Sequence, residues 1–199
     1  MKKGGLDNKT GFTIIEVVLV LAIAGLIFIM VFVALPALQR SQRDTSRRED
    51  ILNFVSEVKK YMISNRGPLP GSGDTIDNNT IVNVTWNDTL AGSTGGNNKW
   101  SGFYRDYLGE KFVDPDGENY SLSVMRCGMG TDEQCSETTQ PRVSAALEGL
   151  YEAAFPNEYK IYVILQAKCD GNNPVGSSNS RNIAVLYRLE GAGVYCANT

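Results

Sequence analysis

The sequence feature that most constrains this chain is a run of 22 residues without a charged side chain, from Val17 to Leu38. As an α-helix the run would be about 33 Å long, enough to cross the hydrocarbon core of a bilayer, which is about 30 Å thick. Core helices of soluble proteins rarely stay apolar on all sides over such a length. We therefore expect a transmembrane segment over about residues 17–38, directly preceded by one acid, Glu16.

The charges before this run predict its orientation. Residues 1–11 contain three lysines and one aspartate, so by the positive-inside rule this end of the helix lies in the cytoplasm. Everything after Leu38 is then expected outside the cytoplasm. The whole chain carries a net charge of −3, so it has no general basic surface that would hold nucleic acid.

Cysteine and histidine usage narrows the function further. All four cysteines, Cys127, Cys135, Cys169 and Cys196, lie in the part expected outside the cytoplasm, where an even number favours disulfides. The chain has no histidine, which removes the commonest general base and the commonest metal ligand. No glycine-rich phosphate loop and no nucleophile with a neighbouring base is recognisable. We therefore expect neither catalysis nor a cofactor.

The helical pattern continues beyond the apolar run. Residues 39–50 are polar and contain no Gly or Pro, so nothing in them ends a helix. Apolar side chains then recur at steps of three and four residues until Gly67 and Pro68 end the pattern. We expect the apolar face of this helix to lie across a sheet. The predicted organisation is a leader over residues 1–11, one helix over 12–66 and a globular domain over 67–199.

Alternation of apolar and polar residues predicts the strands of that domain. Period two is typical of half-buried antiparallel strands, so we expect an α+β fold with an antiparallel sheet. Weaker signals indicate a short strand over 80–86 within a long loop, and helices over 100–112 and 141–155. The alternating strands are expected over residues 120–124, 159–168, 181–190 and 194–197.

The segment GFTIIEVVLVLAIAG, from Gly11 to Gly25, resembles the N-terminus of type IV pilins and pseudopilins. The match consists of a basic leader ending in Gly11, then Phe12, then Glu16 four residues later, then an unbroken apolar helix. An ordinary membrane anchor has no reason to keep an acid at this offset. The resemblance covers about residues 1–65. It implies the type IV pilin fold, in which a long helix packs on an antiparallel sheet.

This resemblance implies a processing event and an assembly contact. A membrane-embedded prepilin peptidase would cut between Gly11 and Phe12, and the new amine of Phe12 would be methylated. In the filament, the Glu16 carboxylate of one subunit would pair with the Phe12 amine of its neighbour, an attraction that is strong away from water and sets the stagger between helices. The alternative left open is that Glu16 lies among lipid headgroups without a partner.

Two helix-weakening residues lie in or near the apolar run, Gly25 and Pro36. In the pilin family, the stretch between such a Gly and Pro can unwind in the filament. Here the two residues lie farther apart than in the usual pattern. A kink tolerated within a membrane helix is the alternative.

Three acids gather in the segment VDPDGENY, namely Asp114, Asp116 and Glu118. Spaced acids around a glycine make a weak calcium candidate, although the spacing is not that of an EF-hand. Asp-Pro-Asp-Gly is also a favourable β-turn before a strand, which is the interpretation we prefer. The segment resembles the Asp-Pro-x-Gly-x-x-Tyr turn of the major pseudopilins of type II secretion.

The cysteines allow three pairings. In a simple meander, alternate strands lie about 9–10 Å apart, beyond the Cα–Cα span of about 4.4–6.8 Å that a disulfide allows. One partner must therefore lie beyond a regular strand. In many pilins a C-terminal bridge encloses a variable loop region. The most local pairing, Cys127 with Cys135 and Cys169 with Cys196, is the one we expect.

The resemblance leads to one functional expectation with two alternatives. We expect a structural subunit of a bacterial surface pilus for adhesion and twitching motility, which spans the cytoplasmic membrane once before assembly. Its partners would be other pilin subunits, the prepilin peptidase and the pilus assembly machinery. The alternatives are a minor pilin for DNA uptake or surface adhesion, and a major pseudopilin. Arginines that could bind DNA or phosphate headgroups are interleaved with acids, so we interpret them as a solvated helix surface: Arg40, Arg43, Arg47 and Arg48.

Overall fold

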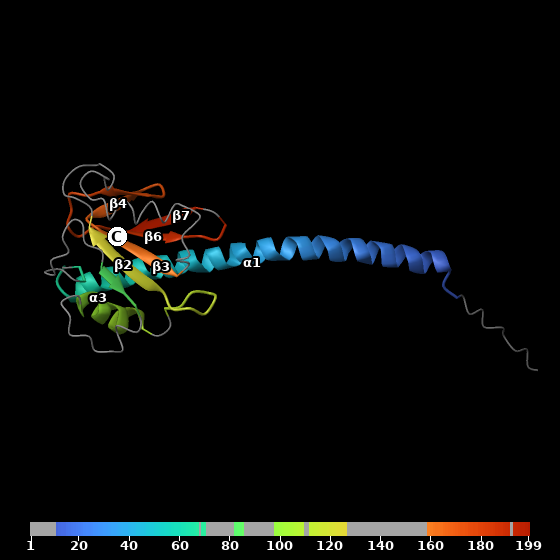
Figure 1. The fold of residues 1–199 in the computed structure, drawn as a ribbon, viewed down its shortest axis with the longest axis horizontal. Coiled ribbons are helices and arrows are strands. Elements are labelled where there is room, and N and C mark those ends of the chain that lie inside the picture. Colours follow the sequence, from blue (N-terminus) through green and yellow to red (C-terminus); the bar gives the residue numbers. More distant parts are fainter. Residues whose placement is uncertain are drawn as a thin grey trace, which may run out of the picture. The chain divides into compact units, whose positions relative to one another are not determined.

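The computed structural model divides the chain into two compact units, Met1–Ser41 and Gln42–Thr199. Helix α1, Ile14–Ser64, contributes to both units (Figure 1). The described residues are 11–67, 69–70, 82–85, 98–109, 112–126, 159–191 and 193–199.

Helix α1 is continuous over 51 residues and confirms the predicted long helix to within two residues at each end. Pro36 lies inside it without ending it. The helix ends where the Gly-Pro signal placed the end: the Gly67 N–H donates to the Met62 carbonyl at 2.6 Å, with Gly67 at φ 106°. This reversal of φ is the usual reason for a glycine after a helix. The second compact unit begins at Gln42, within the helix and not at residue 67, because the second half of α1 is part of its core.

The main sheet has five strands in the order β1-β2-β3-β6-β7. Its neighbours pair antiparallel, except that β2 and β3 run parallel. The expectation of a purely antiparallel sheet is therefore wrong at this pair. Parallel strands need a connection of a dozen or more residues, and segment 127–158 supplies that length. The strands are β1 (Val82–Val84), β2 (Ser121–Arg126), β3 (Lys160–Leu165), β6 (Ile183–Arg188) and β7 (Val194–Asn198).

The predicted strand over 159–168 is interrupted at Gln166, whose φ is 57°. The chain leaves the main sheet there and forms a second, two-stranded sheet of β4 (Ala167–Asp170) and β5 (Asn173–Gly176). The Gln166 side chain is buried, and its oxygen accepts from Arg126 Nη1 at 3.0 Å. Strand β5 was not predicted.

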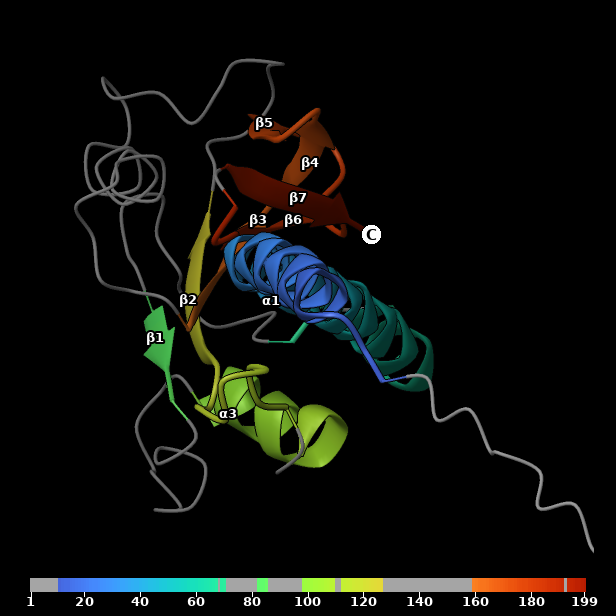
Figure 2. The same cartoon turned by 90° about the vertical axis from the view of Figure 1, so that its right-hand side faces the viewer.

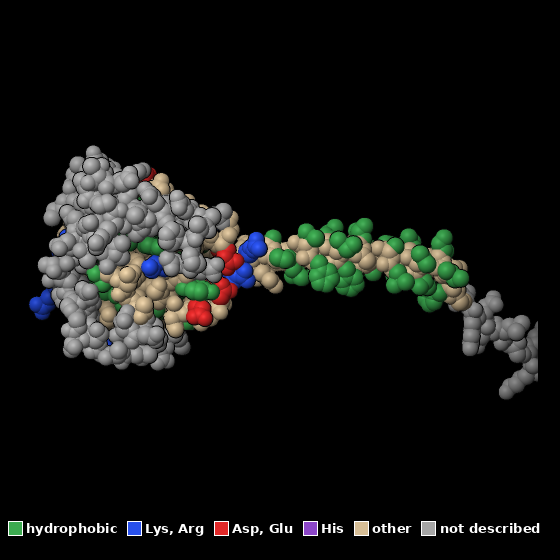
Figure 3. All heavy atoms as spheres, viewed as in Figure 1, with side chains coloured by type: hydrophobic (Ala, Val, Ile, Leu, Met, Phe, Trp, Pro, Cys, Tyr) green, Lys and Arg blue, Asp and Glu red, His purple; other side chains and the backbone are tan. Residues whose placement is uncertain are grey.

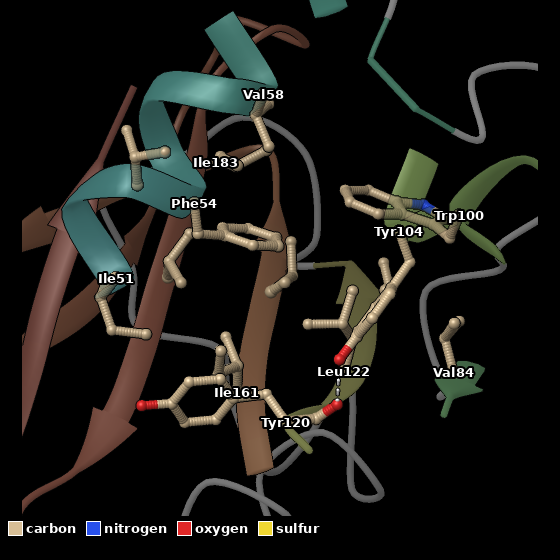
Figure 4. Close-up of a cluster of buried hydrophobic side chains, with 14 of the residues drawn as sticks. Ile51, Phe54, Val58, Val84, Trp100, Tyr104, Tyr120, Leu122, Ile161 and Ile183 are labelled. Carbon is tan, nitrogen blue, oxygen red and sulfur yellow. Dashed lines mark hydrogen bonds between the residues drawn. The ribbon is translucent and has the colours of Figure 1, made fainter. Parts of the chain in front are cut away.

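The main core lies between α1 and one face of the sheet (Figures 2 and 4). Ile51, Phe54 and Val58 of α1 are fully buried there, which confirms the predicted apolar face. Helix α3 (Asn98–Phe103) and the π-helical turn η1 (Tyr104–Leu108) add aromatic side chains, so the helix predicted over 100–112 is found in its first part. The core also holds side chains of alternating strand positions: Leu122, Val124, Ile161, Val163, Leu165, Ile183, Val185 and Tyr187.

The opposite face of the central strands is buried as well. Tyr162 and Ile164 of β3 and Ala184 and Leu186 of β6 belong to a second apolar cluster on that face. The expectation of half-buried strands is therefore wrong for β3 and β6. The helix expected over 141–155 lies outside the described residues.

Candidate functional site

The predicted cleavage site lies directly before α1. Gly11, Phe12 and Thr13 precede the first helical residue, and the Phe12 ring is exposed. The bond between Gly11 and Phe12 is therefore outside the hydrogen-bonded helix. Residues 1–10 of the expected leader lie outside the described residues.

Glu16 forms a capping box with Thr13. The Glu16 carboxylate accepts from the Thr13 backbone N–H at 2.9 Å and from the Thr13 hydroxyl at 2.7 Å. In return, the Glu16 N–H donates to the Thr13 hydroxyl at 3.4 Å. This arrangement satisfies backbone donors at a helix start. It gives Glu16 partners within its own chain, which we had not expected, although Thr-x-x-Glu before an apolar run is the known signature.

Consecutive apolar side chains of the first half of α1 are exposed, so the exposure extends around the helix. Figure 3 shows these side chains on the face of the helix that it draws. In the part of the chain that the structure describes, α1 is long and apolar enough to cross a membrane, and none of its most apolar 18-residue window is buried. Gly25 and Pro36 both lie in regular helix, and a Cβ at Gly25 would meet no atom within 4 Å. The described helix is therefore wound between these two residues.

The second unit contains a group of charged side chains that we call the charged cluster: Arg43, Asp44, Arg47, Asp114, Asp116 and Glu190. Arg47 and Asp114 at its centre are each only 2% exposed. Arg47 Nε and Nη2 donate to the two oxygens of Asp114 at 2.7 and 2.8 Å. The Tyr187 hydroxyl adds a third donor to Asp114 at 3.0 Å. Three elements meet here: α1, the turn before β2 and the strand β6.

The periphery of the cluster joins α1 to the loop after β6. Arg43 donates to both oxygens of Glu190, at 2.8 and 2.7 Å, and Arg47 also donates to Glu190. The two oxygens of Asp44 accept from the backbone N–H groups of Glu190 and Gly191, each at 2.8 Å. A Cβ at Gly191 would lie 2.8 Å from Asp44 Oδ2, so a larger residue there would displace the Asp44 carboxylate.

These contacts favour the charged forms of Glu190, Asp114 and Arg47. The hydrogen bond from Arg43, helped by Arg47, lowers the pKa of Glu190 to about 2. Burial alone would raise the pKa of Asp114, but its bonds from Arg47, the Asp116 N–H and Tyr187 together lower it. Burial likewise opposes the charge of Arg47, and its carboxylate partners outweigh burial, so its pKa is raised. Each charge is thus held by its partners.

The turn interpretation of the acidic segment is confirmed. The Gly117 N–H donates to the Asp114 carbonyl at 2.8 Å, with Gly117 at φ 92°. The Asp114 and Asp116 carboxylates both accept from Arg47, whereas Glu118 is exposed. Within the described ranges, no three acidic, His or Cys side chains are placed to hold a metal ion, so the calcium candidate gains no support.

The interpretation of the arginine segment as solvated is wrong for Arg47, which is buried, as is Asp44. The sequence carried a signal for it: Arg47 lies one turn before Ile51, in line with the buried face of α1. What the sequence did not show was which acids would meet Arg47, because Asp114 and Glu190 are distant in the chain.

The Cys169–Cys196 disulfide is formed, with a Cα–Cα distance of 5.9 Å. Cys169 lies in β4 and Cys196 in β7, so the bridge joins the second sheet to the edge of the main sheet. The break at Gln166 supplies the departure from a regular strand that we expected. Cys127 and Cys135 lie outside the described residues.

The site thus consists of a capped, exposed apolar helix in one unit and a buried charged cluster in the other. The first offers an apolar surface, and the second ties three elements together. Comparison with known proteins adds no relative: no family model matches the chain, and neither does a curated protein or a solved structure.

Proposed function

We propose that this chain is a filament subunit of the type IV pilin class, anchored in the membrane by the first half of α1 before assembly. The observation that carries the proposal is the division of one uninterrupted helix: its first half exposes apolar side chains on all sides, and its second half buries one face in a folded domain. Exposed apolar surface of this extent needs lipid or protein around it.

Helix packing in the filament replaces lipid by protein at little hydrophobic cost, because both surroundings are apolar. The apolar halves form the filament core and the folded units form its surface. Each subunit uses different surfaces to contact its neighbours, so the assembly is an open helix and not a closed ring. The work of the chain is mechanical and adhesive.

The Glu16 capping box supports a part of this proposal. Before assembly, while the subunit is in the membrane, the N–H and hydroxyl of Thr13 donate hydrogen bonds to the Glu16 carboxylate. After cleavage between Gly11 and Phe12, the amine of Phe12 in a neighbouring subunit becomes a charged partner for it. This pairing sets the register between helices, since a wrong register leaves both charges without a partner.

A major pseudopilin of type II secretion is the second candidate. It is favoured by the turn of Asp114–Gly117, which leads into β2 with the residue types of the pseudopilin turn. A minor pilin that binds DNA through the arginine segment is less supported, because Arg43 and Arg47 donate to carboxylates.

The test is mass spectrometry of filaments sheared from cells that produce the chain. We expect the chain to begin at Phe12, with a methylated amine, and to be an abundant component. Abundance in surface filaments separates the major pilin from the minor pilin and the pseudopilin. A chain that retains residues 1–11 in mature filaments, or that never occurs in them, contradicts the proposal.

Replacing the capping acid provides the genetic arm of this test. We expect Glu16→Ala to abolish or strongly reduce filament yield while the protein still accumulates in the membrane. Glu57→Ala is the matched control, because Glu57 is another acid of α1 whose partner, Lys60, lies on an exposed part of the same helix. Equal filament yield from Glu16→Ala and the unchanged chain contradicts the register mechanism.

A further inference from the structure

The attachment of α1 to the second unit changes in chemical kind at Ile51. From Ile51 onward the buried side chains of α1 are apolar: Ile51, Phe54, Val55 and Val58. Between Gln42 and Asp50 the buried side chains are Asp44 and Arg47, both charged. About two turns of the helix are thus held to the domain without apolar burial.

The partners of these two turns come from two separate places in the chain. Arg47 holds the turn of Asp114–Gly117, and Asp44 holds the two backbone N–H groups at Glu190 and Gly191. Both partner sites are turns next to strands of the main sheet. Two core tyrosines reach this region through their hydroxyls: Tyr187 donates to Asp114 at 3.0 Å, and Tyr120 donates to Asp50 at 2.9 Å.

We infer that residues 43–47 form an electrostatic clasp, which opens and closes as a unit separate from the apolar core. Its charges depend on one another, because removal of one partner leaves the others buried without compensation. The apolar contacts of the core depend on them little, because those of α1 begin at Ile51, one turn after Arg47, and the core residue Tyr187 meets the cluster through its hydroxyl. Local opening of a protein follows such boundaries between contact types.

The clasp has a consequence for helix unwinding. Unwinding that spreads from the apolar half of α1 reaches Arg43 and Arg47 before it reaches Ile51. The clasp is therefore the first part of the second unit that such unwinding meets. If the chain is a filament subunit, as proposed above, tension along α1 is passed to the sheet at the clasp; this clause alone rests on the proposed function.

The backbone N–H groups of Glu190 and Gly191 report on the clasp directly, since their acceptor is the Asp44 carboxylate. Residue-resolved hydrogen exchange of the full chain in detergent micelles measures their opening. We expect the Arg47→Met substitution to make exchange at these two positions at least about tenfold faster, once the measured rates are corrected for intrinsic exchange rates. The amide of Val185 in β6, a strand of the core, should change by less than about twofold.

Two results would overturn the inference. Unchanged exchange at Gly191 would mean that Arg47 does not hold the clasp. Equal acceleration at Gly191 and Val185 would mean that the clasp and the core open together. Neither result depends on whether the chain forms filaments, so the two proposals fail separately.

A milder variant covers the case in which Arg47→Met does not fold. Glu190→Gln keeps the size of the side chain and removes the charge that Arg43 and Arg47 share. Gly191 exchange should then become about threefold faster, and an unchanged rate would overturn the inference. Lys60→Met is the matched control, because it removes the exposed ion pair with Glu57 from the same helix and should leave Gly191 unchanged.

Discussion

The two halves of α1 differ in what surrounds their side chains. The half up to Ser41 exposes apolar side chains in every direction. At its start, the Glu16 carboxylate accepts a hydrogen bond from Thr13. The half from Gln42 buries one apolar face in the core and adds a buried arginine held by carboxylates. The backbone is helical throughout.

This difference shows that the residues which make α1 helical do not determine what surrounds each half of it. Helix α1 needs only suitable residues to form, but each half needs its own surroundings to be stable. For the second half, the surroundings are in the same chain. For the first half, no described residue buries the most apolar stretch, and the proposed function gives it lipid or other subunits as surroundings.

The largest effect expected is the loss of a buried ring. Phe54→Ala should lower the unfolding free energy of the second unit by about 3–5 kcal/mol, because it leaves a cavity in the core. Phe28→Ala in the first half is the matched control: Phe28 is 64% exposed and should leave that free energy unchanged. Denaturant unfolding followed by tryptophan fluorescence measures both. Equal destabilisation by the two variants would break the comparison.

An arginine introduced into each half of α1 compares how the two halves contribute to membrane insertion. Ile27 and Leu52 are almost equally exposed, at 53% and 51%. Ile27→Arg should make membrane insertion less favourable by about 3 kcal/mol, whereas Leu52→Arg should have no effect on insertion, since residue 52 lies in the folded unit. Resistance of the protein to extraction from membranes at alkaline pH is the measurement. If both variants stayed in the membrane equally well, the first half would not be the membrane segment.

Breaking the Cys169–Cys196 bridge tests whether the second half of α1 depends on the sheet that it covers. Cys169→Ser with Cys196→Ser should cost the second unit about 2–3 kcal/mol, because the unfolded chain regains freedom over the closed loop. Circular dichroism should show that the first half stays helical in micelles when the second unit unfolds. Loss of all helix in one transition would contradict two independent halves.

Acid should weaken the contacts of the second half of α1 through Glu190. The pKa of Glu190 is lowered from 4.5 to about 2 in the folded chain, so its contribution is complete above pH 4.5 and is lost as the pH falls toward 2. Allowing for its partial exposure, we expect a loss of about 1 kcal/mol over this range. Burial raises the pKa of Asp50, so its protonation acts in the opposite direction.

Unfolding curves at a series of pH values measure this loss. Glu190→Gln should flatten the dependence between pH 4.5 and 2. A dependence of the same steepness in this variant would assign the acid sensitivity to other groups.

The smallest expected effect lies at the start of the first half. Thr13→Ala removes the hydroxyl of the capping box and should destabilise the first turn of α1 by up to about 1 kcal/mol. Thr13→Ser keeps the hydroxyl and should restore the turn. Amide exchange at Glu16 in micelles measures both, and equal exchange in all three chains would show that the cap is not needed there.

The sequence alone determined the features that rest on local patterns. The ends of α1, the turn at Asp114–Gly117 and the strands β6 and β7 follow from residue types and periods that act within a few neighbours. The buried face of α1 was also predictable, because an apolar stripe on a helix has to be covered.

Only the tertiary structure decided the direction of β2 against β3, the break at Gln166 and the partners of Arg47. Alternation of side chains says which face of a strand is apolar and nothing about the direction of its neighbour. A charged residue within a buried stripe becomes tolerable only when carboxylates from distant segments reach it. Such contacts depend on where the whole chain brings its segments, and no local pattern contains that information.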